Sequence, residues 1–584
     1  MKNSIVKTEM VQPLMNVARR YSAMPEYATF ASAFVLLLAA RQGIRFPLPN
    51  LDAILDEAED IPLYVRSFIE ETIGGHWREY QQAVGAFDEE SLSDFFAVES
   101  VALLMSARED VSVHPVIDTL CAALLDIKKG DEVADLNCGI GKFVCKAWFS
   151  LWNANGSDKG LRVSGYSENK TLAAVSWIGC HVAGVRAEII NNSIFSPTNS
   201  RYDKVLVIPP FGCEVRQLNI IEVAESLSKK FNSFPEVRLS SAEWLFAARA
   251  ATLLKDGGRA IAVMPMNILN GGLSKVYREH LIRNQMIEAV ISIPAKYFMN
   301  GTGIALALVV LSDGKKEIKF VNGEEYLKDV AESVSIDVQS LLKDYHNLND
   351  FESVTTRPLD KICENDFILT PDFYLGEDFE YNNSRPFGEL VGEIRRGAKL
   401  SIAEWKKYET TADTPVKKVA FKNFSEGLID DALPCLMEIP EGASDAVLED
   451  GDLIISRMGM PFKIAVVQAS EGETLVADEN VWICRMHGDK KQSYFLRAFL
   501  ESQKGAKWMS RLSTGASLRT ISAKNIGKIP VPEFDEKTRG VIAAELEKNT
   551  ILVRENRKRL NESLAAMKRV WGMGNGELRM GNEE

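Results

Sequence analysis

The sequence predicts an α/β protein whose central part is a doubly wound, Rossmann-like parallel sheet. Between residues 111 and 330, short β-rich runs alternate with helical stretches, a pattern typical of parallel strands joined by crossover helices. Residues 1–110 place apolar side chains at helical spacing, which predicts a helical N-terminal domain. After a connecting region at 331–385, short strand-like runs at 386–534 and a long helix within 535–584 predict an α+β domain with a terminal helix.

The length and composition indicate a multidomain globular protein. At 584 residues the chain exceeds the roughly 250–300 residues that one hydrophobic core supports. Hydrophobic residues make up 46% of the chain and charged residues 26%, which argues against extended disorder. The net charge of −13 has the wrong sign for bulk attraction to nucleic acid. Any contact with DNA therefore needs a local basic surface.

The cysteines and the apolar runs argue against several other classes of protein. The eight cysteines include no CxxC pair and no Cys/His cluster at zinc spacing, so neither a disulfide framework nor a metal site is expected. The longest apolar run, Phe30–Ala40, is shorter than the ~20 residues needed to cross a bilayer. The opening residues do not resemble a signal peptide. We therefore expect a cytoplasmic protein.

Apolar periodicity places the elements of the first two domains. Helical stretches are expected at Tyr27–Ala40, Leu51–Glu71 and Ser91–Ser106, the first of them apolar on all sides and hence buried. Strands of the central domain are expected at Glu132–Leu136, Lys204–Ile208, Arg259–Met264, Ala289–Ile293 and Ala305–Leu311.

The C-terminal domain combines short strands with helices. Strands are expected at Val416–Phe421, Asp452–Ser456, Ala465–Gln468 and Val481–Arg485, and a helical stretch at Tyr494–Lys507. The terminal helix, from 535 to 571, repeats apolar residues about every 3.5 positions: Ile542, Leu546, Val553, Leu560, Leu564, Met567 and Trp571. This repeat is typical of a coiled-coil strand that needs a partner.

A glycine-rich turn follows the first predicted strand of the central domain. In Asp135–Gly141, with sequence DLNCGIG, the glycines at 139 and 141 permit a tight turn and a close approach to a ligand. The next helix offers free N–H groups at its N-terminus. The turn suits a nucleoside-bearing cofactor, although glycine also serves such turns for steric reasons alone.

This segment resembles the S-adenosylmethionine turn, DPACGTG, of the adenine-N6 DNA methyltransferases that form type I methylation subunits. The resemblance implies that Asp135, Asn137, Gly139 and Gly141 bind S-adenosylmethionine. It continues where the family has its YTP segment, its acidic ribose ligand and the Asp that contacts adenine of the cofactor. The residues at these positions are His114 and Pro115, Ser167 or Glu168 according to strand register, and Asn192.

Further along, Tyr202–Gly212 is similar to the catalytic segment FDxxxxNPPFG of that family. Ile208, Pro209, Pro210 and Phe211 stand at the positions of the NPPF loop. Three later segments, Leu253–Pro265, Glu288–Pro294 and Gly303–Ile304, follow the family's remaining strands. The resemblance thus spans about two hundred residues and implies a Rossmann-like methyltransferase fold.

Ile208 departs from the family at its most demanding position. The family's asparagine accepts a hydrogen bond from the exocyclic amine of the target adenine, and isoleucine accepts none. Leaving a buried amine without this partner costs roughly 1–3 kcal/mol before misorientation is counted, so a loss of ~10²-fold or more in rate is expected. The departures at His114, Ser167 and Asn192 point the same way, so impaired catalysis is expected. The alternative is an active enzyme that uses Glu168, Asp135 and the backbone carbonyl of Ile208.

Residues from 386 onward resemble one half of a type I specificity subunit, a target-recognition domain followed by a spacer helix. The resemblance is carried by Gly451–Gly459, Thr514–Ile521 and Ile526–Pro532. It implies double-stranded DNA as a partner and phosphate or base-edge contacts by basic residues. These are Lys417, Lys418, Lys422, Arg457, Arg519 and Lys524, with Arg396, Lys399 and Arg511 as further members of the set.

A homodimer and further partners are also expected. Specificity subunits carry two recognition domains and this chain carries one, so dimerisation through 535–571 would restore the pair. An active methylase, a nuclease or another defence effector is a possible partner. An NAD-type oxidoreductase built on the same glycine turn explains neither the Pro-Pro-Phe loop nor the recognition domain.

Overall fold

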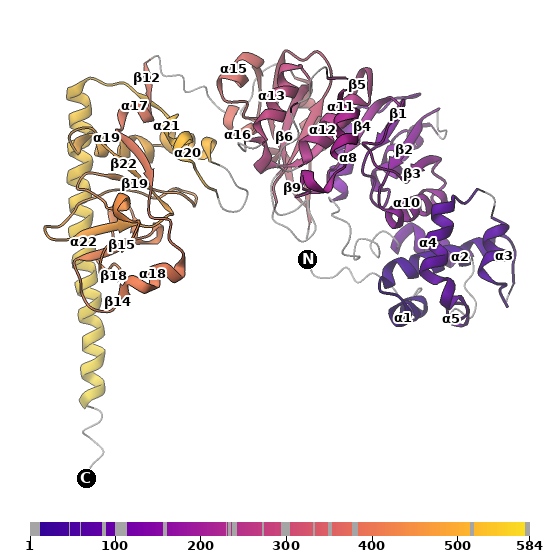
Figure 1. Cartoon of the computed structure of the whole chain (residues 1–584), viewed down its shortest axis with the longest axis horizontal. Helices are drawn as coiled ribbons and strands as arrows, with labels where there is room; N and C mark the ends of the chain where they lie inside the picture. Colours follow the sequence, from indigo (N-terminus) through magenta and orange to yellow (C-terminus); the bar gives the residue numbers. More distant parts are fainter. Residues whose placement is uncertain are drawn as a thin grey trace, which may run out of the picture. The chain divides into compact units, whose positions relative to one another are not determined.

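The computed structural model divides into two compact units, Met1–Glu377 and Asp378–Glu584 (Figure 1). It describes residues 12–45, 47–58, 60–83, 89–99, 114–155, 160–228, 230–231, 235, 242–270, 274–293, 304–330, 333–347, 353–375, 383–513 and 519–577. Several sequence predictions lie outside the described residues: the end of the stretch Ser91–Ser106, Gly303, the segment 514–518 and the side chain of Trp571.

A large sheet forms the centre of the first unit. Its strands are β1 (Glu132–Asp135), β2 (Arg162–Tyr166), β3 (Ala187–Ile190), β4 (Tyr202–Val207), β5 (Leu254–Pro265), β6 (Ile287–Ile293), β7 (Leu306–Leu311), β8 (Glu317–Asn322) and β11 (Val354–Pro358). Among the described residues these nine strands have the order β11-β8-β6-β7-β5-β4-β1-β2-β3. A separate hairpin pairs β9 (Leu327–Val330) with β10 (Ser333–Ile336). The five predicted strands of the central domain are all present.

The sheet departs from the purely parallel prediction at two strands. β7 runs antiparallel to both β5 and β6, and β11 runs antiparallel to β8. Antiparallel neighbours need only a short link, whereas parallel neighbours need a crossover connection. β11 belongs to the predicted connecting region 331–385 and forms an edge strand of the sheet.

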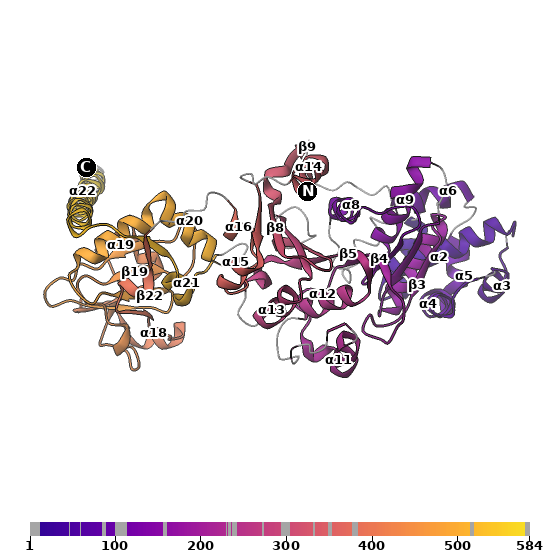
Figure 2. The ribbon, with the colours of Figure 1, turned by 90° about the horizontal axis from the view of Figure 1, so that it is seen from above.

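Helices cover both faces of the sheet. Those of the central part are α8 (Pro115–Leu125), α9 (Lys142–Asn155), α10 (Lys170–Val182), α11 (Ile220–Ser228), α12 (Glu243–Thr252), α13 (Lys275–Arg283), α14 (Val338–His346), α15 (Leu359–Glu364) and α16 (Pro371–Tyr374). Figure 2 shows α8 and α14 on one side of the sheet and α12 and α13 on the other. This arrangement is the predicted doubly wound α/β fold.

The helical N-terminal segment packs within the first unit. Its helices are α1 (Gln12–Tyr21), α2 (Pro25–Arg41), α3 (Leu51–Asp56), α4 (Leu63–Ile73), α5 (Trp77–Ala83) and α6 (Glu89–Asp94). α2 is buried along most of its length, as its apolar sequence predicts. The predicted helix Leu51–Glu71 is two helices, because Pro62 cannot continue a helix. The hydroxyl of Tyr64 donates to the carbonyl of Ile189 at 2.9 Å and links α4 to β3.

The second unit contains two four-stranded sheets among its described residues. Its strands are β12 (Ser384–Pro386), β13 (Glu393–Arg396), β14 (Glu409–Thr410), β15 (Val416–Val419), β16 (Phe424–Ser425), β17 (Leu428–Ile429), β18 (Cys435–Leu436), β19 (Leu453–Ser456), β20 (Ile464–Val466), β21 (Thr474–Ala477), β22 (Val481–Arg485) and β23 (Pro530–Pro532). One sheet has the order β13-β22-β19-β20 and the other β14-β18-β15-β21. The four predicted strands correspond to β15, β19, β20 and β22.

The helices of the second unit are α17 (Phe387–Leu390), α18 (Ile402–Tyr408), α19 (Lys491–Glu501), α20 (Gln503–Leu512), α21 (Ala523–Gly527) and α22 (Glu536–Glu577). The predicted stretch Tyr494–Lys507 is two helices, because Ser502 adopts an extended conformation and caps α20 through its side chain.

The long terminal helix α22 packs against its own unit near its start. Ala543 and Thr550 are buried, and the guanidinium of Arg497 donates to the hydroxyl of Thr550 at 2.8 Å. Further along, Leu560 and Leu564 are 58% and 47% exposed. In the part of the chain that the structure describes, no helix is long and apolar enough to span a membrane.

Candidate functional site

The glycine-rich turn lies at the carboxyl end of β1, which pairs with β2 and β4 in the sheet. The carboxylate of Asp135 accepts a hydrogen bond from the backbone N–H of Asn137 at 3.1 Å and so shapes the start of the turn. Gly139 and Gly141 have φ values of 51° and 81°, in the left-handed region that favours glycine. The turn leads directly into α9, whose N-terminal N–H groups face the same edge of the sheet.

Gly141 also meets α10 closely, which gives a testable stability effect. A Cβ built on Gly141 would lie 2.5 Å from the hydroxyl oxygen of Ser176 and 3.4 Å from its Cα. Gly184 has a similar φ of +70° but no atom within 4 Å of such a Cβ. We expect Gly141→Ala to lower the free energy of unfolding by about 3 kcal/mol and Gly184→Ala by about 1 kcal/mol, measured by urea denaturation. Equal losses in the two variants would contradict this packing argument.

Glu168, and not Ser167, presents a side chain to solvent at the end of β2. Ser167 is 3% exposed, and its hydroxyl donates to the carbonyl of Asn169 at 3.2 Å. Glu168 is exposed, and its charge contributes to a raised pKa of the Cys213 thiol, after burial and the charge of Glu243. The carboxylate of Glu168 therefore lies within electrostatic reach of the loop after β4. Of the two predicted ribose ligands, only Glu168 has this geometry.

Asn192 and His114 have their polar atoms engaged locally. The side-chain oxygen of Asn192 accepts from the backbone N–H of Ser193 at 2.9 Å and from the hydroxyl of Ser196 at 3.1 Å. His114 caps α8, since its Nδ1 accepts from the N–H of Val116 at 3.3 Å. Burial and, to a smaller extent, the charge of Lys142 lower the pKa of His114. The imidazole is therefore neutral at neutral pH, as its acceptor role at the helix terminus requires.

The predicted catalytic loop, Ile208–Phe211, follows the end of β4 beside the glycine-rich turn. The side chains of Ile208 and Phe211 are partly buried and pack against the core of the sheet. The side-chain amide Nδ2 of Asn137 donates to the backbone carbonyl of Ile208 at 2.7 Å. This hydrogen bond thus joins the glycine-rich turn directly to the predicted catalytic loop, at the position where the family has its asparagine.

Glu243 holds the other end of this loop and was not predicted from the sequence. It is 2% exposed at the start of α12, and its Oε1 accepts from the N–H of Gly212 at 3.0 Å. The N–H of Ala242 donates to the carbonyl of Cys213 at 2.9 Å. No motif marks a buried glutamate of this kind, because the loop it holds lies about thirty residues earlier in the chain.

These residues fit S-adenosylmethionine, the cofactor that the resemblance implies. The left-handed glycines keep side chains away from the turn, and the exposed carboxylate of Glu168 is the type of group that binds ribose hydroxyls. Both lie at the carboxyl edge of parallel strands, where α/β proteins bind their ligands. The fit is poorer at Asn192, whose carbonyl oxygen is already bonded.

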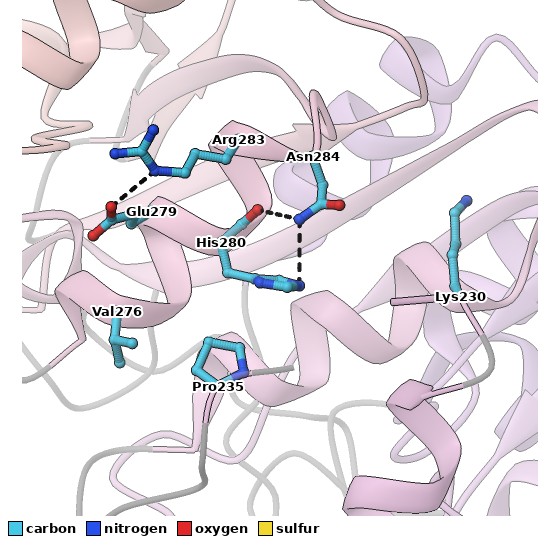
Figure 3. Close-up of a pocket in the computed structure, with 7 residues that line it drawn as sticks. All are labelled: Lys230, Pro235, Val276, Glu279, His280, Arg283 and Asn284. Atoms are coloured by element: carbon cyan, nitrogen blue, oxygen red, sulfur yellow. Dashed lines mark hydrogen bonds and ion pairs between the residues drawn. The ribbon is translucent and has the colours of Figure 1, made fainter. Parts of the chain in front are cut away.

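Of two cavities in the first unit, one borders these residues and the other does not. One, of ≈ 580 Å³, is lined by Pro115, Gly141 and Lys142 together with apolar side chains of α2 and α10. The other, of ≈ 360 Å³, lies at α13 and is shown in Figure 3. Its polar groups are bonded to one another, with Arg283 on Glu279 at 2.8 Å and the amide of Asn284 on the carbonyl of His280 at 2.8 Å. None of the predicted site residues lines this second cavity in the described part of the chain.

In the second unit, several predicted cations surround one turn, Asp478–Asn480. Arg396 bonds the carboxylate of Glu479 at 2.8 Å, and Arg457 donates to the backbone carbonyl of Glu479 at 2.9 Å. Burial raises the pKa of Asp478, and the charges of Lys418 and Lys422 oppose this rise. We call Arg396, Lys418, Lys422 and Arg457 the 478–480 cations.

The other predicted basic residues are distributed around this group. Arg519 lies on a segment bridged to that of Arg457, because Met458 pairs with Thr520. Its guanidinium donates to the carbonyl of Ser510 at 3.1 Å. Lys417 forms ion pairs with Asp413 and Glu473 at 3.7 and 3.4 Å. Lys524 is exposed on α21, Lys399 lies beyond β13, and Arg511 is buried against the ring of Trp508.

Comparison with known proteins identifies relatives of the first unit. Residues 114–382 match the family model described as N-6 DNA Methylase. The MjaVII methylase subunit of a type I restriction enzyme from Methanocaldococcus jannaschii is 22% identical over 283 residues, which cover 44% of this chain and 47% of that protein. The MjaVIII methylase subunit from the same organism is 21% identical over 322 residues, 50% of this chain and 54% of that protein. The chain thus spans about half the length of the curated relatives it matches.

Among solved structures, the methyltransferase subunit of a type I restriction-modification system from Streptococcus thermophilus is similar. It has 15% sequence identity and a TM-score of 0.47, and the match covers 63% of this chain and 100% of that one. The family match and the curated relatives confirm the predicted resemblance to N6 DNA methyltransferases and type I methylase subunits. S-adenosylmethionine is the cofactor that this family implies. The fused recognition domain and the loss of catalysis stay predictions.

Proposed function

Because the chain is a homologue of type I methylase subunits with an N-6 DNA methylase domain at residues 114–382, we propose that it binds duplex DNA at a specific sequence and methylates adenine slowly. The observation that carries the proposal is the side chain at the acceptor position of the catalytic loop. Ile208 offers only an apolar group there, and that group packs against the core of the sheet.

Most of the residues expected to bind the methyl donor are present in the proposed site. Gly139, Gly141 and the N-terminus of α9 would hold the nucleoside end of S-adenosylmethionine, and Glu168 its ribose hydroxyls. When bound, S-adenosylmethionine supplies a methyl group to the amine nitrogen, which loses one proton to water, while the sulfur keeps the electron pair of the broken C–S bond. Asp135 acts on this end indirectly, through the bond that shapes the turn.

The part of the site that would bind the target base departs most from the family pattern. Pro209, Pro210 and Phe211 still provide a rigid loop and an aromatic ring against which an extruded base stacks. The amine of that base loses the side-chain oxygen that would orient its lone pair toward the methyl group. Misorientation of the amine slows the transfer.

The second unit would supply DNA recognition. The 478–480 cations would supply a local basic surface on a chain whose net charge is −13, as phosphate contacts require, with phosphate replacing the ion pairs of Arg396 with Glu479 and of Lys418 with Glu409. Lys417, Arg519 and Lys524 extend this surface. The exposed Leu560, Leu564 and Met567 of α22 would pair with a second copy, which predicts a two-part DNA site. An active methylase or a nuclease of a defence system is a further partner in this proposal.

Selection from random-sequence duplexes with the full-length protein tests the DNA-binding part. We expect enrichment of one two-part sequence and a sedimentation mass that corresponds to a dimer. Calorimetric titration should show micromolar binding of S-adenosylmethionine that is strengthened by the selected duplex. Enrichment of no sequence would refute specific recognition. Transfer to the selected duplex at a rate that Ile208→Asn does not raise would refute slow methylation.

A further inference from the structure

The side chain of Asn137 reaches from the donor turn to the catalytic loop. Its Nδ2 donates to the backbone carbonyl of Ile208 at 2.7 Å, and its backbone N–H is held by Asp135 at 3.1 Å. Two short bonds therefore fix both the backbone and the side chain of Asn137. A carboxamide held in this way has one defined orientation.

That orientation leaves the oxygen of the carboxamide as an acceptor. The carbonyl of Ile208 only accepts, so the NH₂ end of Asn137 must face it and Oδ1 must face away. Asn137 is only partly buried, and Oδ1 forms no hydrogen bond with any described residue. Oδ1 is also not among the buried polar atoms that lack a partner. It is therefore open to a ligand that approaches the loop.

The two positions joined by this bond differ together from the family pattern. In the motifs quoted above, position 137 corresponds to the alanine of DPACGTG and position 208 to the asparagine of NPPF. This chain has asparagine at 137 and isoleucine at 208. A carboxamide therefore lies on the glycine-rich turn instead of at position 208, and the structure places it in contact with the backbone carbonyl of Ile208.

We infer that the carboxamide oxygen of Asn137 is the acceptor for the exocyclic amine of the extruded base, in place of the missing side chain at 208. Asn137 then accepts from a base that carries an amine, such as adenine, and discriminates against a base without one. This inference rests on the proposed function, because it names the group that binds the target base at that same site. It is also consistent with the slow methylation proposed above.

The competing explanation gives Asn137 a purely structural role, in which its Nδ2 holds the loop and its oxygen faces water. The two explanations differ in their response to the base and to position 208. If Asn137 is the acceptor, removal of the amine from the DNA weakens binding. Loss of the Asn137 side chain is then compensated by a new acceptor at position 208. A structural clamp responds to neither.

The test uses the full-length protein and the duplex selected above, with each adenine replaced in turn by purine, which lacks the amine. We expect the wild-type protein to bind one purine-substituted duplex about tenfold more weakly than the adenine duplex. Asn137→Ala should abolish this difference. Asn191→Ala is the matched control, since Asn191 also ties a loop at this edge through its Nδ2, to the carbonyl of Ser167 at 2.9 Å, and it should keep the difference.

Methyl transfer from radiolabelled S-adenosylmethionine gives the second readout. We expect Asn137→Ala to lower the single-turnover rate about tenfold, and Asn137→Ala/Ile208→Asn to restore it to at least the wild-type rate. A wild-type protein that binds the duplex without distinguishing adenine from purine would overturn the inference and leave DNA recognition intact. Failure of the double variant to recover would assign Asn137 the structural role. If no duplex is bound, the proposed function fails and the inference fails with it.

Discussion

Ile208→Asn is expected to raise the rate of methyl transfer to adenine by about 10²-fold. The new side-chain oxygen would be a second acceptor for the exocyclic amine, in addition to the oxygen of Asn137, and it would orient the lone pair toward the methyl group. Because Asn137 already contacts the carbonyl of Ile208, the backbone of the loop is held in place for the new residue. The measurement is the single-turnover rate on the selected duplex with saturating S-adenosylmethionine.

Ile208→Val is the control for this experiment, because it changes the shape of the side chain without adding an acceptor. Its rate should stay within about threefold of the wild type. Ile208 packs partly on the core, so Ile208→Asn should also cost about 1 kcal/mol of stability, which thermal denaturation will detect. A rate increase of equal size in both variants would show that the volume of the side chain at position 208, and not hydrogen bonding, limits methyl transfer.

Removal of two of the 478–480 cations should have the second large effect. We expect Lys422→Ala/Arg457→Ala to weaken binding to the selected duplex by about 10²-fold at physiological salt, because each lost phosphate or base contact costs ~1–3 kcal/mol. If both groups contact phosphate, the slope of log K against log salt should also fall by about 2. Fluorescence anisotropy over a series of salt concentrations measures both quantities.

Lys548→Ala/Lys558→Ala removes the same charge from exposed positions on α22 and should change affinity by less than about threefold. Arg457 also bonds the turn through the carbonyl of Glu479, so circular dichroism of the variant must match the wild type. Equal losses of affinity in the two double variants would mean that net charge, and not this cluster, controls binding.

Much of the candidate site could be predicted from short motifs. The strand, the glycine turn and the Pro-Pro-Phe loop are each local patterns, and their placement at neighbouring strand ends follows from the topology of a parallel sheet. Strand register was not predictable in this way, which is why Ser167 and Glu168 are alternatives in the sequence; the burial of Ser167 favours Glu168. Glu243 could not be found, because its bond to Gly212 joins distant segments.

The sequence by itself determined an α/β domain that resembles N6 DNA methyltransferases, with an apolar residue in the predicted catalytic loop, since both follow from short motifs along the chain. Only the tertiary structure decided which side chains meet. The direction of β7, the closure of the sheet by β11 and the bond from Asn137 to Ile208 depend on packing between segments far apart in the chain. Such contacts leave no periodic signal in a single sequence, because their free energy arises only when the segments are folded together.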